Sequence, residues 1–238
     1  MPNIFVGTSG WVYQHWRNVF YPEDLSQNRW FEYYTQFFNS VELNVTFYRL
    51  PKKETFKGWF RRSPKNFYFV AKGSRFITHI KRLDDEATLK NFFNACLELK
   101  EKLAAVLWQL PSYQRKDLVR LENFLKALKK YKIRNVFEFR DRSWFVKETY
   151  DILKDYNVCL CIADSIFWPQ EKVLTADFLY LRFHGRDGLY SGNYSDKELK
   201  YWANFALSFK KDIFAFFNND AFGFAVKNAL RFKEFLKE

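Results

Sequence analysis

Four ionisable side chains lie within or directly after apolar runs of this chain, at positions where a protein could use them for chemistry. They are Glu42, Glu138, Asp164 and His184. Carboxylates and an imidazole can transfer protons as general acids and bases. Together they can also hold a divalent metal ion that activates water or polarises a phosphoryl oxygen. We therefore take these four as the candidate catalytic residues.

A second set of polar and aromatic side chains near the same positions could bind an anion. Two cations, a glycine and a serine fall within the four residues 72–75, and such a loop can surround an anionic group. Arginines can add two parallel hydrogen bonds to a phosphate or a carboxylate. The candidate ligand-binding residues are Ser9, Trp11, Asn44, Lys72, Arg75, Gln109, Arg140, Trp144, Arg182, Tyr190 and Asn218.

The elements that must position these residues are eight apolar runs, each typical of a β-strand. The second run, read with a period of two, puts Val41, Leu43, Val45 and Phe47 on one face. Amphipathic helix patterns follow the runs, except that the connection 165–177 is too short for a comfortable crossover helix. The eight runs cover residues 4–6, 38–51, 67–71, 104–109, 135–139, 158–163, 179–181 and 213–217.

Alternating strands and helices of this kind indicate parallel strands with right-handed crossovers. The sequence therefore predicts an α/β, TIM-barrel-like (β/α)8 fold with one degenerate β/α unit, formed by residues 1–238 as a single domain. In such a barrel the carboxyl ends of all strands meet at one mouth, so we expect the polar residues to converge there. The competing interpretation is that Glu42 or Glu138 pairs with Arg140 or Arg182 and that the network only closes the barrel top.

The net charge of the chain indicates which class of partner it could bind. The 39 Lys and Arg residues against 27 Asp and Glu give a net charge of +12 and a pI near 9.5. That balance suits an anionic partner such as DNA, RNA or a phosphorylated metabolite, although lysines on outer helix faces would produce it too. The three cysteines lie in apolar runs and are expected to be reduced core residues. No signal peptide or membrane-spanning run is visible, so we expect a soluble, cytoplasmic protein without a membrane partner.

Several unusual strings occur in a fixed order along almost the whole chain. They include GTSGW at 7–11, FNSVELNVTFYRLP at 38–51, KGSRFITH at 72–79, LWQLP at 107–111 and YLRFHG at 180–185. These strings resemble the domain-of-unknown-function family 72, also called YecE-like. The resemblance implies a TIM-barrel-like fold and no established activity. One departure is Asp141, where the family pattern leads us to expect a histidine after Arg140.

Three functions fit these residues, and the sequence leaves all three open. The first is an enzyme that acts on a phosphorylated or nucleic-acid substrate, with a divalent metal as an optional cofactor and an analogy to endonuclease-IV-like barrels. The second is metal-free acid/base catalysis on a small metabolite. The third is a non-catalytic nucleic-acid-binding module that combines cations with stacking aromatic residues. The oligomeric state is not indicated.

Overall fold

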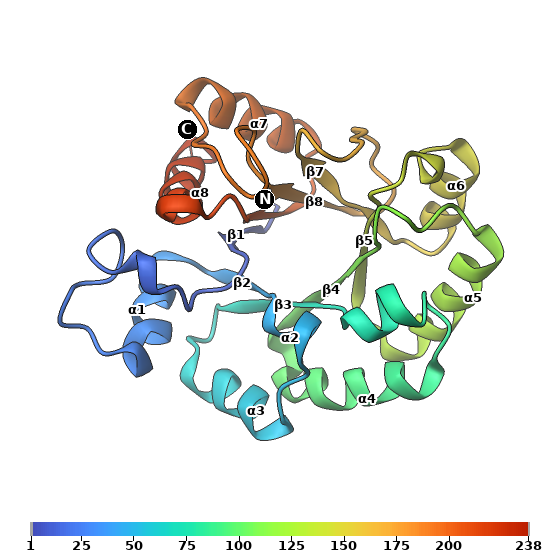
Figure 1. The fold of residues 1–238 in the computed structure, drawn as a ribbon, viewed down its shortest axis with the longest axis horizontal. Helices are drawn as coiled ribbons and strands as arrows, with labels where there is room; N and C mark the ends of the chain where they lie inside the picture. Colours follow the sequence, from blue (N-terminus) through green and yellow to red (C-terminus); the bar gives the residue numbers. More distant parts are fainter. Residues whose placement is uncertain (1, 238) are drawn as a thin grey trace.

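A ring of parallel strands forms the centre of the molecule, and helices surround it (Figure 1). The computed structural model describes residues 2–237. Every hydrogen-bonded pair among the named strands is parallel. The strands are β1 (Ile4–Thr8), β2 (Ser40–Leu43), β3 (Tyr68–Lys72), β4 (Leu103–Gln109), β5 (Arg134–Glu138), β6 (Cys159–Leu160), β7 (Ile162–Asp164), β8 (Phe178–Phe183) and β9 (Asp212–Phe217). This TIM-barrel-like α/β architecture confirms the fold class predicted from the sequence.

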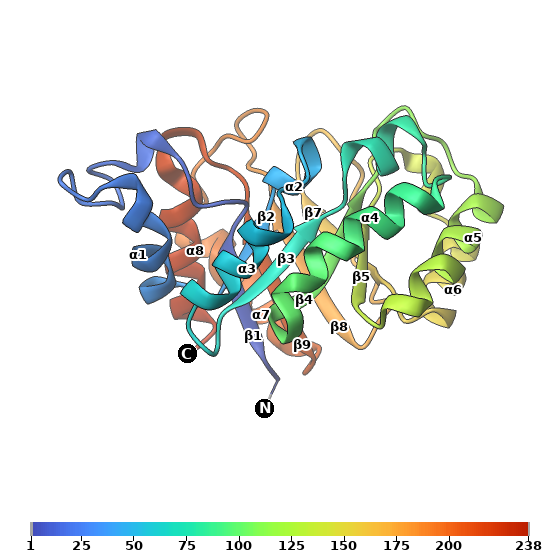
Figure 2. The same ribbon diagram turned by 90° about the horizontal axis from the view of Figure 1, so that it is seen from below.

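The helices run antiparallel to the strands on the outside of the ring (Figure 2). They are α1 (Trp30–Phe37), α3 (Lys53–Arg62), α4 (Glu86–Cys96), α5 (Leu118–Leu128), α6 (Lys147–Asp155), α7 (Asp196–Ser208) and α8 (Phe224–Phe235). The short α2 (Val45–Tyr48) instead lies at the C-terminal ends of β2 and β3. Within residues 2–237, no helix combines the length and the apolar character needed to cross a membrane. The connection 165–177 contains no helix, as its length predicted.

The strands form two hydrogen-bonded arcs, β1-β9-β8-β7 and β2-β3-β4-β5-β6. Only Cys161 separates β6 from β7, so the two arcs are joined there by the chain itself. The single strand expected over residues 158–163 is therefore split in two. At the opposite junction, the Asn39 side chain accepts from the Val6 amide at 3.1 Å and donates to the Ile4 carbonyl at 2.6 Å. At this β1–β2 junction, the Asn39 side chain thus supplies hydrogen bonds that backbone groups supply between the other strands.

A close backbone approach supports the same β1–β2 junction. The Tyr34 hydroxyl accepts from the Thr8 amide at 2.9 Å and donates to the Ser40 carbonyl at 3.1 Å. A Cβ atom on Gly7 would lie 2.1 Å from the Ser40 oxygen, which is far inside van der Waals contact. Gly7 is required because only a residue without a side chain lets the two strands come this close.

Side chains alternate between the inside of the ring and the layer beneath the helices. Val41 and Leu43 belong to the large core cluster under the helices. Glu42 lies between them and must point into the ring, where Val70 and Tyr180 form part of a smaller inner core. Polar residues on the inward positions at the strand ends therefore share one small space at the mouth.

The alternating pattern predicted for residues 38–51 is wrong beyond Leu43. The chain turns into the short helix α2, in which Val45 and Tyr48 are exposed. The Thr46 hydroxyl is hydrogen-bonded to the carbonyls of Leu43 and Lys72, at 2.7 and 2.6 Å. This hydroxyl has one hydrogen, which the two carbonyls share, so a side-chain donor stands where the backbone pairing of both strands ends.

Replacement of Gly7 by alanine tests the β1–β2 junction. We expect Gly7→Ala to lower the free energy of unfolding by about 2–3 kcal/mol, because the strands must separate to admit the methyl group. Urea unfolding of both proteins measures the difference. Gly58→Ala in α3, where an added Cβ meets nothing within 4 Å, is the matched control and should be neutral or slightly stabilising. Equal effects of the two substitutions would contradict the close approach.

Candidate functional site

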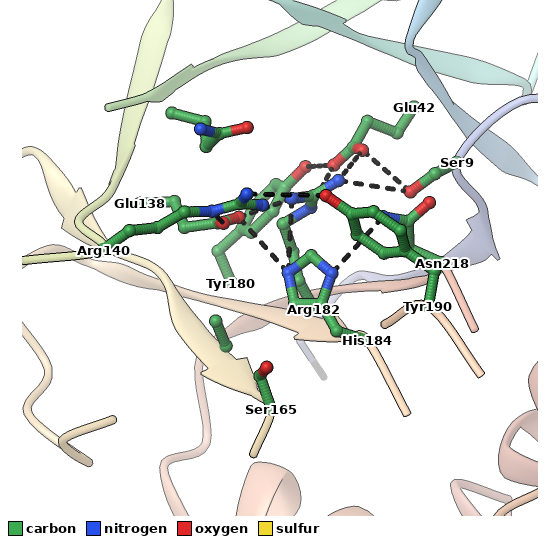
Figure 3. Close-up of polar contacts among 12 residues, drawn as sticks. Ser9, Glu42, Glu138, Arg140, Ser165, Tyr180, Arg182, His184, Tyr190 and Asn218 are labelled. Atoms are coloured by element: carbon green, nitrogen blue, oxygen red, sulfur yellow. Dashed lines mark hydrogen bonds and ion pairs between the residues drawn. The ribbon is translucent and has the colours of Figure 1, made fainter. Parts of the chain in front are cut away.

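Arg182, near the end of β8, is the centre of a buried ionic cluster at the C-terminal mouth (Figure 3). Its Nε and Nη2 donate to the two carboxylate oxygens of Glu42 at 3.0 and 2.6 Å, and its Nη1 donates to Glu138. The hydroxyls of Ser9 and Tyr180 also donate to Glu42, at 2.8 and 2.7 Å. One fully buried guanidinium therefore ties β2, β5 and β8 together.

Arg140, His184 and Asn218 continue this cluster toward the solvent. Arg140 Nε donates to the second oxygen of Glu138 at 2.7 Å. His184 places Nε2 3.5 Å from Glu138 Oε2 and Nδ1 3.3 Å from the side-chain nitrogen of Asn218. Burial lowers the pKa of His184 to about 4, so its imidazole is neutral at pH 7.

Two aromatic residues cover Arg140. The centre of its guanidinium lies 3.6 Å from the ring centroid of Trp168, and Nη1 is 3.4 Å from the hydroxyl of Tyr190. The rings of Trp168 and Tyr190 also lie against His184, with centroids 5.0 and 5.6 Å away. Arg140 Nη2 is buried and has no hydrogen-bond partner among the residues that the structure describes. The site thus contains a cationic donor without an acceptor.

The charges of the cluster decide its protonation. Burial alone would raise the pKa of both Glu42 and Glu138, but the positive charge of Arg182 outweighs it and lowers both pKa values. Lys72 adds to the effect on Glu42, and Arg140 adds to the effect on Glu138. The same contacts raise the pKa of Arg182. All three groups are therefore charged at neutral pH.

Lys72, the last residue of β3, is buried beside this cluster with only 7% of its surface exposed. Its Nζ lies 4.3 Å from the ring centroid of Phe47, and within residues 2–237 it makes no hydrogen bond and no ion pair. Burial, with the charge of Arg182 as the next cause, lowers the pKa of Lys72 to about 7. With Lys72 protonated, Lys72, Arg140 and Arg182 carry one more charge than Glu42 and Glu138 carry.

The donor set does not fit a divalent metal ion. Both oxygens of Glu42 and both oxygens of Glu138 accept from arginine. Residues 2–237 include no group of three or more His, Cys, Asp or Glu side chains placed to hold a metal. The metal version of the sequence hypothesis therefore gains no support from this geometry.

The structure brings most of the predicted site residues together at the mouth. Asn44 donates to the Ser9 carbonyl at 3.2 Å, and its Oδ1 is buried without a partner among the described residues. Gln109 lies with its amide nitrogen 3.5 Å from Nε2 of His79. The predicted residues found in or beside the cluster are Ser9, Glu42, Asn44, Lys72, Gln109, Glu138, Arg140, Arg182, His184, Tyr190 and Asn218.

Asp164 lies at a strand end as predicted, but it faces away from the cluster. Its register partner in β8 is Phe183, which packs in the outer core, whereas Arg182 is paired with Ala163. Asp164 instead accepts from Arg186 at 2.9 and 3.2 Å, on the helix side of the strand. Because neighbouring residues of a strand point to opposite faces, Asp164 lies on the other face of the sheet from the charged groups of the cluster.

Three residues predicted to bind a ligand also lie outside the cluster. Trp11 is buried against Phe31 and Trp59. Trp144 is buried and donates to the carbonyl of Gln114 at 2.7 Å. Their ring size and apolar surface are used in the core, which is the commoner fate of tryptophan in such loops. Arg75 is exposed on the segment after β3 and could reach a ligand only from the rim.

Two residues of the cluster were missed in the sequence. Tyr180 has the same parity as Arg182 and His184 in β8, so the two-residue period could have placed it inside. Trp168 carried no such signal, because it lies in the irregular connection 165–177 and reaches the site only through the path of that segment.

The rim around the cluster is rich in exposed apolar and aromatic side chains. Tyr48 and Phe222 are 79% and 78% exposed. Exposed cations lie on the segments after β3, β4 and β5, namely Arg75, Lys81, Arg82, Arg115, Lys116 and Arg142, while Asp84 and Asp117 are the exposed carboxylates of residues 73–84 and 110–117. The other exposed apolar residues on the segments that follow the strands include Val12, Phe76, Ile80, Tyr113, Ile166, Phe167 and Leu189.

Fold and site together define a TIM-barrel-like α/β protein whose strand ends enclose a buried ionic cluster. The sequence model of the family described as "Protein of unknown function DUF72" matches residues 5–238, and the chain belongs to this family. This confirms the resemblance seen in the sequence.

Solved and curated relatives agree with this assignment. A DUF72 family protein from Thermotoga maritima MSB8 has a TM-score of 0.89 and 31% identity, covering 99% of this chain and 100% of its own. The UPF0759 protein YunF of Bacillus subtilis (strain 168) is 26% identical, over 98% of this chain and 94% of its own. A D-psicose 3-epimerase from Clostridium cellulolyticum H10 has a TM-score of 0.57 at 10% identity, over 98% of each chain, which shows likeness of fold alone.

The pH dependence of stability tests the ionic cluster. Glu138 has a lowered pKa in the folded protein, so its stabilising contribution is complete above its unfolded value of about 4.3 and is lost as the pH falls below that value. We expect Glu138→Gln to be less stable than the wild type by about 3 kcal/mol at pH 7, with the gap narrowing as the pH falls below about 4.3.

Urea unfolding at a series of pH values measures this difference. Glu54→Gln changes an exposed glutamate in the first turn of α3 and should follow the wild-type profile. A constant gap between Glu138→Gln and wild type at every pH would contradict the assignment of a charged, ion-paired Glu138.

Proposed function

We propose that the C-terminal mouth binds a phosphorylated ligand, with single-stranded nucleic acid as the leading candidate. The observation that carries the proposal is the unpaired cationic surface at the mouth. Arg140 has a buried nitrogen without an acceptor, and Lys72 has no acceptor at all within the described residues. A buried cationic donor such as Arg140 Nη2 is costly while it has no acceptor, and a phosphate oxygen is such an acceptor.

The charge of the cluster favours an anion over a cation. Glu42 and Glu138 are already neutralised by Arg182 and Arg140, so the mouth presents surplus positive charge to a ligand. A phosphate oxygen could replace the aromatic face of Trp168 as the partner of Arg140. The net charge of +12 adds long-range attraction for a polyanion.

Nucleic acid is favoured among phosphorylated ligands because of the rim. Exposed rings such as Tyr48, Tyr113 and Phe222 surround the mouth, and exposed cations cluster on the segments after β3, β4 and β5. Stacking on aromatic rings combined with backbone contacts to cations is how single strands are bound without sequence preference. A duplex would not expose its bases to these rings.

Metal-free acid/base catalysis on a small phosphorylated metabolite is the second candidate function. The observation that favours it is Lys72, whose lowered pKa leaves an appreciable neutral fraction at pH 7. A neutral buried amine can act as a base, and a protonated one can act as an acid.

Replacement of Arg140 tests anion binding at the mouth. We expect Arg140→Gln to weaken binding of a fluorescent single-stranded oligonucleotide by about tenfold and to reduce the salt slope by about one, since one phosphate contact is lost. Fluorescence anisotropy across a salt series measures both quantities. Inorganic phosphate should compete with the oligonucleotide for the wild type.

Arg61→Gln is the matched control. It removes the same charge from an exposed arginine in the last turn of α3, at the opposite end of the barrel. This variant should keep nearly wild-type affinity. A binding constant that does not change with salt, or equal losses in the two variants, would count against the mouth as the site.

A further inference from the structure

We propose that Lys72 is a reactive amine that forms an imine with the carbonyl carbon of a phosphorylated aldehyde or ketone bound at the mouth. This inference rests on the proposed function, because Arg140 would hold the phosphate while the carbonyl group lies against Lys72. The ligand class is therefore narrowed to molecules that carry a carbonyl group near a phosphate. An abasic nucleotide in a strand and a free sugar phosphate share this chemistry.

A comparison of two buried lysines carries the inference. Lys102 is 6% exposed and donates to the Phe60 and Ser63 carbonyls and the Ser63 hydroxyl, at 2.9, 2.8 and 2.7 Å. Its three hydrogens are fully used, as expected for a structural lysine. Lys72 is 7% exposed, yet within residues 2–237 its ammonium group has only the face of Phe47 as a close partner. Within residues 2–237, Lys72 therefore lacks the hydrogen bonds that hold the ammonium group of Lys102 in place.

The charged groups that face Lys72 come from four elements. Arg182 belongs to β8, Glu42 to β2, and Glu138 with Arg140 to the end of β5. His79, on the helical turn after β3, has its own pKa lowered to about 4, first by burial and then by the charge of Lys72. Arg182 already neutralises the carboxylates, so they do not hold a proton on Lys72 as a direct ion pair would.

The neutral form of Lys72 follows from this environment. Burial and the charge of Arg182 bring its pKa to about 7, so about half of the amine is unprotonated at pH 7. An unperturbed lysine with a pKa of about 10.4 has roughly one neutral molecule in 2,500 at that pH. Only the neutral amine has the lone pair that attacks a carbonyl carbon.

The chemical step balances without an oxidant, a reductant or a metal. The Nζ lone pair forms a bond to the carbonyl carbon, and the carbonyl oxygen takes a proton while Nζ loses one. The resulting carbinolamine then loses one water and leaves a C=N bond. Sodium cyanoborohydride adds hydride to that carbon and converts the imine into a stable secondary amine, which can be mapped by mass spectrometry.

The experiment uses two aldehydes and one analogue without a carbonyl group. Pyridoxal 5′-phosphate is the small probe, and a single-stranded oligonucleotide with one abasic site is the nucleic-acid probe. Each is incubated with the full-length protein at pH 7 and trapped with cyanoborohydride, and the modified peptides are quantified. Pyridoxine 5′-phosphate, which lacks the aldehyde, measures phosphate binding alone.

We expect the Lys72 peptide to be labelled on the order of 100-fold faster than the peptides of exposed lysines, with a rate that rises with a midpoint near pH 7. Lys72→Arg keeps the charge but cannot form the trapped imine, and should lose at least about tenfold of the total adduct. Lys126→Arg, at an exposed position of α5 away from the mouth, is the matched control and should keep the adduct.

The outcomes separate the two proposals. If pyridoxine 5′-phosphate binds but no adduct forms at Lys72, the proposal of an imine at Lys72 is wrong, and the proposal of a phosphate site at the mouth is still supported. No binding of pyridoxine 5′-phosphate or of the oligonucleotide would overturn the proposed function. An adduct spread over surface lysines, equal in the wild type and in folded Lys72→Arg, would also overturn the inference. Trapping of one probe but not the other identifies the source of the carbonyl ligand.

Discussion

The mouth of this barrel is organised by the burial of one guanidinium between two carboxylates. Taking Arg182 out of water costs several kcal/mol, and that cost is met only because Glu42 and Glu138 both accept from it with good geometry. The three side chains come from strands far apart in the sequence. They therefore fix the relative position of β2, β5 and β8, and any change that removes one of them leaves an uncompensated charge in the interior.

This constraint also decides which groups remain available to a ligand. Since the carboxylates are committed to arginine, a metal ion would have to compete with Arg182 for them. The charged groups left without such commitments are cationic, namely Lys72 and one nitrogen of Arg140. The ion pairs of the glutamates are structural, and the cationic groups beside them are those that the proposed anion would contact. Charge pairing that closes the barrel top and ligand binding at the mouth, which were alternatives in the sequence analysis, are therefore compatible.

The missing helix of the degenerate unit has a local consequence at this site. Residues 165–177 form an irregular segment and bring Trp168 over Arg140 and His184. A regular crossover helix would have placed this segment on the outside of the ring, as the other helices are placed (Figure 1). Trp168 shields the unpaired guanidinium from solvent, so a ligand that reaches Arg140 must displace the ring or slide beside it. The degenerate unit therefore places an aromatic ring over the proposed binding site.

The sequence predicted the strands and their polar ends because burial on both faces leaves a clear apolar run with a polar stop. The sequence could not predict which of the polar residues at the strand ends point into the ring, because that depends on the register of the strands. Asp164 and Arg182 both stand at strand ends, yet the pairing of Arg182 with Ala163 leaves Asp164 on the outer face. Residues 45–48 left the strand pattern because Thr46 pairs with backbone acceptors that only the folded arrangement brings near. Trp168 was missed for the same reason, because tertiary path and not local pattern puts it in the site.

The total charge of the chain is a weaker guide than the balance within the cluster. A net charge of +12 is spread over many exposed lysines and arginines that water and salt screen. At the mouth, three cationic groups meet two carboxylates where little water reaches, and each unpaired donor there has a much larger effect. Lys72 and Lys102 make the point within one molecule, because at nearly equal burial Lys102 donates three hydrogen bonds and Lys72 donates none. The placement of acceptors around a buried amine, more than the number of lysines, is therefore the basis for proposing chemistry at Lys72.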